Sequence, residues 1–306
     1  MTTVGSMRKS YRVLVIFGGD SPERAVSLIS GPAVVNALRE AGHTVGAWDP
    51  SETRSEDLHR GDWDVAFPML HGTNGEDGVI QRTLQEIGLP WIGCSAASST
   101  LTFDKSLTRE RLQQCGIQVP PGQTITSSKA SAPLQYPVVV KPARQGSSIG
   151  VTIVNCEADW LPALARAFSL GSDVVVETYI DGREISVPVV DGTVLPAVEI
   201  RVPGRWYDYH SKYESDATEY CVAALDLPAN LNDVAAKACE ACEAVGILRV
   251  DFRVDNTGQI YVLEINTIPG MSPHSLVPMS VESTGMSLAD FCDLRIQHRM
   301  NSLSPG

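Results

Sequence analysis

LRVDFRVDNTGQIYVLEIN, residues 248–266, predicts two antiparallel strands joined by a turn at 255–258. Apolar and polar residues alternate on both sides of the turn, as in a hairpin with one buried face. With a two-residue loop at Asn256 and Thr257, the apolar partners across the hairpin are Leu248 with Ile265, Val250 with Leu263, and Phe252 with Tyr261. The last third of the chain is therefore expected to contain an antiparallel sheet.

The second face of this hairpin is polar, because successive side chains of a strand point to opposite faces. It carries Arg249, Asp251, Glu264 and Asn266, with Arg249 predicted opposite Glu264 and Asp251 diagonal to it. Two carboxylates and a carboxamide are the oxygen ligands that Mg²⁺ prefers, and an arginine beside them suits an anionic group. The alternative is a solvated sheet face with a cross-strand Arg–Glu pair.

The rest of the chain predicts a change of architecture along its length. In the first third, strands expected at 12–17, 45–48, 64–70 and 90–93 alternate with helices at 25–41 and 77–87. Such alternation is typical of a parallel sheet covered by helices. The middle predicts helices at 107–115 and 159–168 and strands at 137–141, 151–155 and 173–180. A hairpin at 185–200 and helices at 232–245 and 286–300 complete the expected elements of an α/β unit joined to an α+β unit.

Composition excludes several classes of protein. Hydrophobic residues make up 43% and charged residues 20% of the 306 positions, as in soluble globular proteins. The net charge of −12 argues against a nucleic-acid surface, and no apolar stretch approaches the length of a membrane span. The first residues lack the pattern of a secretory signal, and the seven cysteines are an odd number. We therefore expect reduced thiols and a cytoplasmic location.

A lysine and a Gly/Ser loop in the middle of the chain form a possible phosphate site. Lys141 ends a predicted strand, and residues 145–150 (QGSSIG) follow it. Backbone N–H groups and hydroxyls of such a loop can cradle phosphates. It is not a Walker A loop, because the lysine precedes the glycines. The alternative is an ordinary surface turn.

Two glycine-rich segments follow predicted parallel strands, where ligands bind in α/β sheets. They are GGDSPER (18–24) and HGTNGEDG (71–78). A tight strand-to-helix connection capped by Ser21, and a structural His71, are the respective alternatives. A third segment, YDYHSKY (207–213), has the polar and aromatic character of a lid, although it is equally compatible with an ordinary loop.

Taken together and in this order, these motifs resemble the D-alanine–D-alanine ligase family of the ATP-grasp superfamily. The matching segments cover roughly residues 11–296 and are GGDSPERAVSLISG (18–31), HGTNGEDGVIQ (71–81), GLPWIGCSAASSTLTFDK (88–105), VVKPARQGSSIGV (139–151), YDYHSKY (207–213), RVDF (249–252), LEINTIPGMS (263–272) and HSLVP (274–278). The resemblance implies an α/β fold, α+β in its C-terminal part. A Rossmann-like domain at 1–104 would precede ATP-grasp subdomains at 105–183 and 184–306.

The activity implied by the resemblance is ATP-dependent ligation of two D-alanine molecules through an acyl phosphate, with release of ADP and phosphate, for peptidoglycan precursors. It also implies two Mg²⁺ (or Mn²⁺) ions and a homodimer. Another carboxylate–amine ligase, using D-serine, D-lactate or another amino acid as second substrate, is the alternative. A regulatory protein on the same fold should lack a metal ligand, and a dinucleotide oxidoreductase would need GxGxxG after the first strand.

The resemblance also implies a role for individual residues. The metal ligands would be Asp251, Glu264 and Asn266. ATP would be bound by Lys105, Lys141, Ser147, Ser148, Glu177, Glu184 and Lys212, and the second D-alanine by Ser275 and Leu276. Glu23 would hold the amino group of the first D-alanine, with His71 near its carboxylate.

The remaining implied roles concern catalysis. Arg249 and the Gly270 N–H would bind the oxyanion of the tetrahedral intermediate. Glu23, Ser147 and Tyr213 would form a hydrogen-bonded triad, and a tyrosine rather than a phenylalanine at 213 favours an amine nucleophile over D-lactate. The chain departs from the family pattern at Ala25, which replaces an acid, and at Ile268, where small residues or methionine are frequent.

Overall fold

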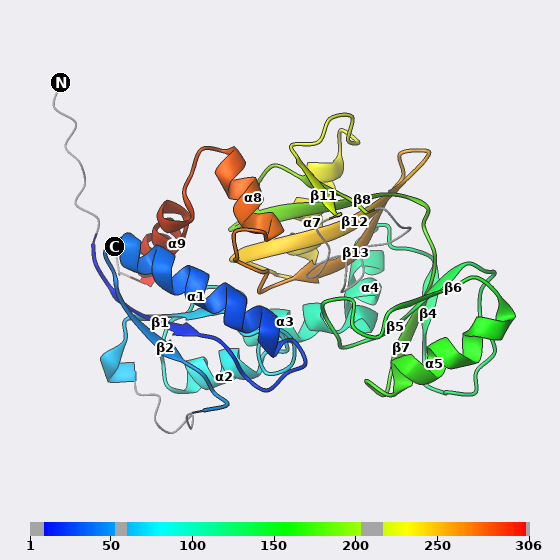
Figure 1. Cartoon of the computed structure of the whole chain (residues 1–306), viewed down its shortest axis with the longest axis horizontal. Helices are drawn as coiled ribbons and strands as arrows, with labels where there is room; N and C mark the ends of the chain where they lie inside the picture. Colours follow the sequence, from blue (N-terminus) through cyan, green and yellow to red (C-terminus); the bar gives the residue numbers. More distant parts are fainter. Residues whose placement is uncertain (1–8, 53–59, 203–216, 304–306) are drawn as a thin grey trace.

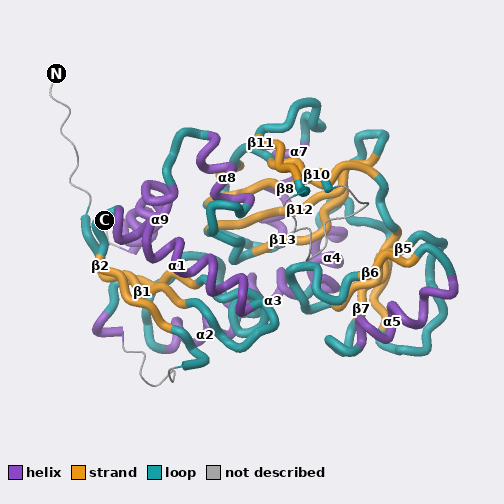
Figure 2. Tube along the Cα trace, viewed as in Figure 1, coloured by secondary structure: helices purple, strands orange, loops and turns teal. Residues whose placement is uncertain are grey.

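The computed structural model of the chain describes residues 9–52, 60–202 and 217–303. Three β-sheets lie side by side in Figure 1, with the parallel sheet at the left, the largest sheet in the centre and a four-stranded sheet at the right. Each sheet draws its strands from one continuous part of the chain, in the order left, right, centre. Figure 2 shows helices packed beside all three.

The first sheet is parallel, as predicted, with strand order β2-β1-β3. Its elements are β1 (Arg12–Ile16), α1 (Arg24–Glu40), β2 (Thr44–Trp48), β3 (Val65–Pro68) and α2 (Val79–Glu86), followed by α3 (Ala96–Phe103) and, between β2 and β3, a 3₁₀ turn η2 (Arg60–Asp62). The strand predicted at 90–93 is wrong. Only Trp91 forms an isolated bridge, to Ala66, before the chain turns at Gly93 with φ of 123°.

The second sheet is antiparallel and has the order β4-β7-β5-β6. Its part of the chain contains α4 (Lys105–Gln114), β4 (Gly122–Ile125), β5 (Val138–Pro142), β6 (Thr152–Val154), η3 (Glu157–Asp159), α5 (Trp160–Phe168) and β7 (Val174–Thr178). Helix α5 covers one face, where Trp160 and Leu164 pack against Val140 and Val176. The opposite face is left to line a pocket.

The third sheet is the largest and has the order β11-β10-β8-β12-β13, with β9 paired to β8. Its elements are β8 (Gly182–Val190), β9 (Thr193–Val194), β10 (Val198–Arg201), β11 (Glu219–Val222), α7 (Leu231–Ala241), β12 (Ile247–Asp255) and β13 (Ile260–Asn266). Helix α7 covers the apolar face, where Leu248, Val250 and Phe252 are fully buried beside Ala235. This face confirms the apolar side predicted for the first strand of the hairpin.

The predicted register of the β12–β13 hairpin is wrong. Asp255 N–H bonds Gln259 O, so the loop has three residues rather than two. A regular ladder from that loop would place Glu264 on the core face, but the register shifts between Asp251 and Phe252. This bulge brings Asp251 opposite Glu264 and Arg249 opposite Asn266. The bulge therefore keeps the polar residues on one face.

The bulge also changes the role of Leu263. Val262 and Ile265 pack in the core of the third sheet. Leu263, between them in sequence, lines the pocket with Glu264. The predicted pairs Val250–Leu263 and Phe252–Tyr261 do not form, because Val250 lies opposite Ile265 and Phe252 lies opposite Val262.

The last two helices return to the N-terminal part of the chain. They are α8 (Leu276–Ser283) and α9 (Leu288–Leu303). In α9, Phe291, Cys292 and Ile296 share a buried cluster with Val34 and Leu38 of α1, beside which α9 lies in Figure 1. Within the described parts of the chain, no helix has the length and apolar character needed to span a membrane.

Candidate functional site

A deep pocket lies between the second and third sheets. It encloses about 870 Å³, part of it open to solvent, and we call it the inter-sheet pocket. Apolar side chains of Val139, Ile153, Ile180 and Leu263 form one part of its wall. The predicted site residues that line it are Lys105, Lys141, Ser148, Glu177, Glu184, Arg249, Asp251, Glu264 and Leu276.

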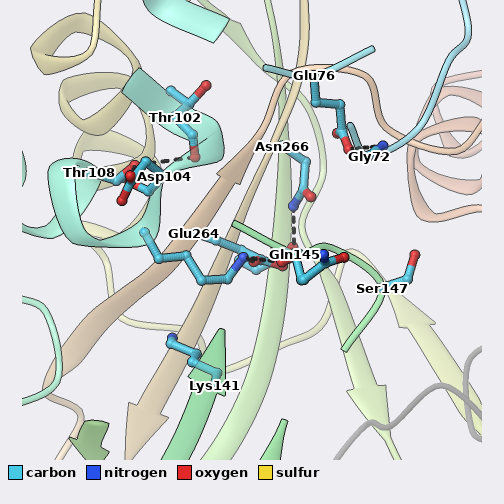
Figure 3. A network of polar contacts seen from close by, with 12 residues as sticks. Gly72, Glu76, Thr102, Asp104, Thr108, Lys141, Gln145, Ser147, Glu264 and Asn266 are labelled. Atoms are coloured by element: carbon cyan, nitrogen blue, oxygen red, sulfur yellow. Dashed lines mark hydrogen bonds and ion pairs between the residues drawn. The ribbon is translucent and has the colours of Figure 1, made fainter. Parts of the chain in front are cut away.

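The polar face of the hairpin forms the floor of this pocket. Asp251 is the centre of its hydrogen bonds: Ser186 Oγ donates to Oδ1 over 2.6 Å, and Asn266 Nδ2 donates to Oδ2 over 3.0 Å. Arg249 Nη2 lies 2.8 Å from Asp251 Oδ2. Asn266 and Glu264 project into the same space in Figure 3. The sequence thus placed these side chains together correctly, although in the wrong register.

This floor fits a hard divalent cation through its donor set, two carboxylates and one amide oxygen. No cluster of three or more His, Cys, Asp or Glu side chains suited to a metal occurs in the described ranges. Asp251, Glu264 and Asn266 would therefore need further oxygen ligands, such as water or substrate phosphate. Mg²⁺ sites are commonly completed in this way.

Lys105 lies at the edge of the floor and links it to the Gly/Ser loop. Its Nζ lies 3.0 Å from Glu264 Oε2 and donates to Gln145 O over 2.6 Å. Burial alone would lower the pKa of Lys105, but the surrounding carboxylates, Glu264 foremost, raise it above its usual value. The side chain is therefore a permanent cation beside the proposed metal ligands.

Lys141 and Glu177 meet on the second sheet. Lys141 Nζ lies 2.6 Å from Glu177 Oε2, and Arg109 of α4 contacts Glu177 Oε1. All three side chains are buried. The Glu177 carboxylate, expected near adenine, is thus already engaged by two cations.

Glu184 lies in the wall of the inter-sheet pocket. Its Oε2 is 3.6 Å from Arg253 Nη2, and Arg253 also donates to Gly182 O over 2.9 Å. The Arg253 guanidinium lies over the ring of Tyr179, 5.5 Å from its centre. These contacts hold Glu184 at the pocket wall, where its carboxylate can meet a ligand hydroxyl.

A second pocket adjoins the first. It encloses about 780 Å³, part of it open to solvent, and we call it the loop pocket. Arg249 and Leu276 line both pockets, so a ligand in one can reach a ligand in the other. The predicted site residues lining the loop pocket are Glu23, His71, Ser147, Arg249, Asn266, Gly270, Ser275 and Leu276.

Glu23 is held at the base of this pocket by two loops. Ser147 Oγ donates to Glu23 Oε2. A Cβ atom on either Gly72 or Gly146 would lie 2.7 Å from Glu23 Oε1. Both glycines therefore allow their backbones to close around the carboxylate. The contact between Glu23 and Ser147, predicted from the resemblance, is present in the structure.

His71 is buried in the wall of the loop pocket. Burial, and then the positive charge of Arg249, lower the pKa of His71 to about 4. Its Nε2 lies 3.3 Å from Ser30 Oγ, and its ring also bonds the backbone of Ile268. At neutral pH the imidazole is therefore uncharged and can form hydrogen bonds without adding charge to the pocket.

The N-terminus of α8 forms the remaining wall of the loop pocket. Ser275 is its N-cap residue, yet its hydroxyl caps no helix N–H and lies 2.8 Å from Ser272 Oγ. A Cβ on Gly270 would lie 2.8 Å from Ser275 Oγ, which shows how closely the two residues approach. The free N–H groups of a helix N-terminus favour a carboxylate.

Three buried residues near the site were not predicted from the sequence. They are Arg109, Ser186 and Glu76, and the last accepts a hydrogen bond from Gly72 N over 2.8 Å. Burial, and then the charge of Glu23, raise the pKa of Glu76 to about 8. Figure 3 shows Glu76 with Gly72 beside Asn266. Ser186 could have been suspected from its alternation with Glu184, but Arg109 lies on a helix with no sequence signal.

Lys212 and Tyr213, together with the rest of the 207–213 segment, lie outside the described residues. Their predicted roles stay predictions. All other predicted site residues line one or both pockets.

An N-terminal parallel sheet followed by two antiparallel sheets that enclose a charged pocket defines an ATP-grasp fold. Comparison with known proteins narrows this class. Family models described as D-ala D-ala ligase N-terminus and D-ala D-ala ligase C-terminus match residues 43–94 and 113–297. The chain belongs to the D-alanine–D-alanine ligase family.

Individual relatives agree with this assignment. A D-alanine–D-alanine ligase of Actinobacillus pleuropneumoniae serotype 5b is 41% identical over 286 residues, 91% of this chain and 94% of the relative. One of Neisseria meningitidis serogroup B is 37% identical over 294 residues, 94% of this chain and 97% of the relative.

Solved structures share the fold. The crystal structure of a D-alanine–D-alanine ligase from Bacillus anthracis has a TM-score of 0.85 and 32% identity, covering 96% of this chain and 98% of the other. A D-alanine–D-alanine ligase from Bacillus anthracis complexed with ATP gives a TM-score of 0.83 at 30% identity, covering 96% of this chain and 98% of the other. The VanG D-Ala:D-Ser ligase from Enterococcus faecalis gives 0.80 at 28%, covering 95% and 100%.

Proposed function

We propose that the chain joins two molecules of D-alanine into D-alanyl-D-alanine and converts ATP to ADP and phosphate. Family membership supports this activity. The main structural support is that the two pockets meet at Arg249, which lines both. A nucleotide in the inter-sheet pocket and an amino acid in the loop pocket would meet beside Asp251 and Glu264.

In the first step a carboxylate oxygen of the first D-alanine attacks the γ-phosphorus of ATP, and ADP leaves. Glu23 holds the ammonium group of this D-alanine, and neutral His71 lies near its carboxylate. Lys105, Lys141 and Lys212 neutralise charge on the phosphates. Phosphoryl transfer depends mainly on such positioning and charge neutralisation.

In the second step the amine of the second D-alanine attacks the carbonyl carbon of the acyl phosphate, and phosphate leaves with the oxygen that formerly belonged to the carboxylate. Ser275 and Leu276 place this second substrate. Arg249 and the Gly270 N–H stabilise the oxyanion of the tetrahedral intermediate. Tyr213 completes the triad with Glu23 and Ser147.

Two Mg²⁺ (or Mn²⁺) ions are part of this proposal, held by Asp251, Glu264 and Asn266. Held by these residues, such ions would neutralise charge on the nucleotide phosphates. The donor set of the pocket floor supports this assignment. Ser147 and Ser148 would cover the phosphates, Glu177 would act beside adenine, and Glu184 would bond the ribose.

We also propose a cytoplasmic homodimer that supplies peptidoglycan precursors. The seven cysteines are all free, which suits a reducing compartment. The three sheets support the division into domains at 1–104, 105–183 and 184–306, although β8 begins at Gly182, just before the last boundary.

The test is a product assay with ATP and Mg²⁺. D-alanine is offered alone and together with D-serine or D-lactate, L-alanine serves as the stereochemical control, and products are identified by mass. The expected result is D-alanyl-D-alanine with one ADP for each peptide. A mixed product formed in preference to the D-alanine dimer would instead favour a ligase with another second substrate.

A further inference from the structure

The charges on the wall of the inter-sheet pocket balance one another. Among the described residues, the cations lining it are Lys105, Lys141, Arg249 and Arg253, and the carboxylates are Glu177, Glu184, Asp251 and Glu264. Each cation lies beside one carboxylate of this set. A balanced wall offers little net attraction to a polyanion, which binds best to an excess of positive charge.

A fifth cation lies directly behind this wall. Arg109, on the buried side of α4, contacts Glu177 Oε1 and donates to Pro120 O over 2.9 Å. Its side chain is only 6% exposed and does not line the pocket. Arg109 therefore acts on the pocket from behind its wall, with Glu177 as its charged partner there.

The three side chains form a buried group with unequal charges. Arg109 and Lys141 bring two positive charges, and Glu177 brings one negative charge. Arg109 engages Oε1 and Lys141 engages Oε2, so the carboxylate charge is divided between them. Because buried charges are poorly screened, the excess is felt strongly at the surface of the pocket.

We propose that Arg109 is a positioning residue that gives the described wall of the inter-sheet pocket an excess of positive charge, by neutralising Glu177 and so leaving the charge of Lys141 available to nucleotide phosphates. The proposal rests on the nucleotide function proposed above. It differs from a purely structural role, in which Arg109 would only hold α4 against the second sheet.

The test separates phosphate attraction from the shape of the pocket. Binding of tripolyphosphate with Mg²⁺ and binding of adenosine are measured by calorimetry, without D-alanine. Arg109→Met is expected to weaken tripolyphosphate binding by about tenfold, the size of one charged hydrogen-bonded contact. Adenosine affinity should change less than about twofold on the same scale.

Charge, rather than contact, is tested by two further variants. Arg109→Lys keeps the positive charge and should retain most of the tripolyphosphate affinity. The double variant Arg109→Met with Glu177→Gln removes one charge of each sign, so it should recover affinity lost in Arg109→Met alone. Arg166→Met removes an exposed arginine from α5 and is the matched control for loss of a surface charge.

Three results would overturn the proposal: equal losses for tripolyphosphate and adenosine, no recovery in the double variant, or an Arg109→Met variant that binds tripolyphosphate as the native chain does. Circular dichroism melting verifies that each variant is folded. If Arg109→Met is unfolded, the tripolyphosphate affinity of the double variant is compared directly with that of the native chain. A native chain that makes the dipeptide but shows one of these results loses only this proposal. A native chain that binds no tripolyphosphate and makes no dipeptide loses the proposed function as well.

Discussion

Ser186 is a small buried residue whose side chain hydrogen-bonds to the pocket floor. It is fully buried on β8 and donates to Asp251 Oδ1 over 2.6 Å. This contact orients the carboxylate that we propose as a metal ligand. Residues that hydrogen-bond to a metal ligand orient it and change the metal affinity of the site.

We therefore expect Ser186→Ala to raise the Mg²⁺ concentration needed for half-maximal activity by about tenfold, the usual size of such effects. The measurement is a Mg²⁺ titration of dipeptide formation at saturating ATP. Ser169→Ala, at an exposed position after α5, is the control. An unchanged Mg²⁺ requirement would show that Ser186 does not orient a metal ligand.

His71 links buried charge to the pH dependence of stability. Its folded-state pKa, about 4, lies below the ordinary value of 6.5. The folded state thus disfavours the charged ring. The contribution of this group to the free energy of unfolding is complete above about pH 6.5 and is lost as pH falls from there toward 4.

His71→Asn removes this titration. We expect the melting temperature of the native chain, minus that of the variant, to decrease as pH is lowered from 7.5 to 4.5. His298→Asn, whose side chain is 63% exposed, gives the baseline for replacing a histidine at the surface. A difference that stays constant over this range would contradict the assignment of a buried neutral imidazole.

Most residues that line the two pockets could be predicted from the sequence, because they lie in short local motifs. HGTNGEDG places His71 and Glu76 in one turn, but nothing in the letters shows that Glu76 is buried whereas Asp77 is only partly so. Arg109 was not predicted because its partner Glu177 is far away in sequence.

At the scale of elements, the β5–β6 loop closes on Glu23 through Gly146. The backbone of Gly146 passes so close that a Cβ would lie 2.7 Å from Glu23 Oε1. Because the atoms that the new methyl group would meet lie at the far end of the rotatable Glu23 side chain, the methyl group should displace this side chain rather than unfold the loop. Small displacements of a substrate-positioning group can be costly for catalysis.

Gly146→Ala is accordingly expected to leave the melting temperature nearly unchanged while lowering kcat/KM for D-alanine by about a hundredfold. Gly171→Ala, where no atom would lie within 4 Å of the new Cβ, is the matched control. Steady-state kinetics and calorimetry together give the answer. Loss of stability without loss of kcat/KM would contradict a positioning role for this loop.

The elements that the sequence did not predict, α3, α8, β4 and β11, are all short. Helix α3 (AASSTLTF) is built from small and polar residues, and it begins where Ser95 accepts a hydrogen bond from Ser98 N. Helix α8 contains Pro278 in its first turn, a position that tolerates proline. Strands β4 and β11 are short edge strands.

The hairpin register failed for a different reason. Asp255 Oδ1 accepts hydrogen bonds from Thr257 N and Gln259 N and so stabilises a three-residue loop. The bulge at Leu263 then restores Glu264 to the polar face, which the three-residue loop alone would have placed on the core face. Neither feature is visible in the alternation of apolar residues, which a two-residue loop without a bulge satisfies equally well.

At the scale of the whole molecule, helix α9 near the C-terminus contacts the start of the parallel sheet near the N-terminus. His43 Nε2 lies 3.1 Å from Asp293 Oδ1, and Tyr11 N donates to His43 Nδ1 over 3.1 Å. Both side chains of the pair are almost fully buried. This contact joins α9 to the parallel sheet, an interaction between distant segments that no local pattern could reveal.

Asp293→Ala leaves a buried histidine without its carboxylate partner. We expect the free energy of unfolding to fall by about 1–3 kcal/mol, the cost of leaving a buried hydrogen-bond donor without its acceptor. Asp293→Asn, which keeps a hydrogen-bonding group, should lose less. Denaturant unfolding at pH 7.5 measures both, and equal stabilities of all three chains would show that this contact does not hold the two ends together.

In the proposed reaction, the γ-phosphoryl group of ATP in the inter-sheet pocket is transferred to the carboxylate of the D-alanine in the loop pocket. The most direct measurement uses D-alanine labelled with ¹⁸O in its carboxyl group, ATP and Mg²⁺, with the released phosphate and the peptide analysed by mass. We predict one ¹⁸O in each phosphate released, and one dipeptide for each ADP. Unlabelled phosphate, or ADP formed without dipeptide, would show that water attacks ATP and would contradict phosphoryl transfer to D-alanine.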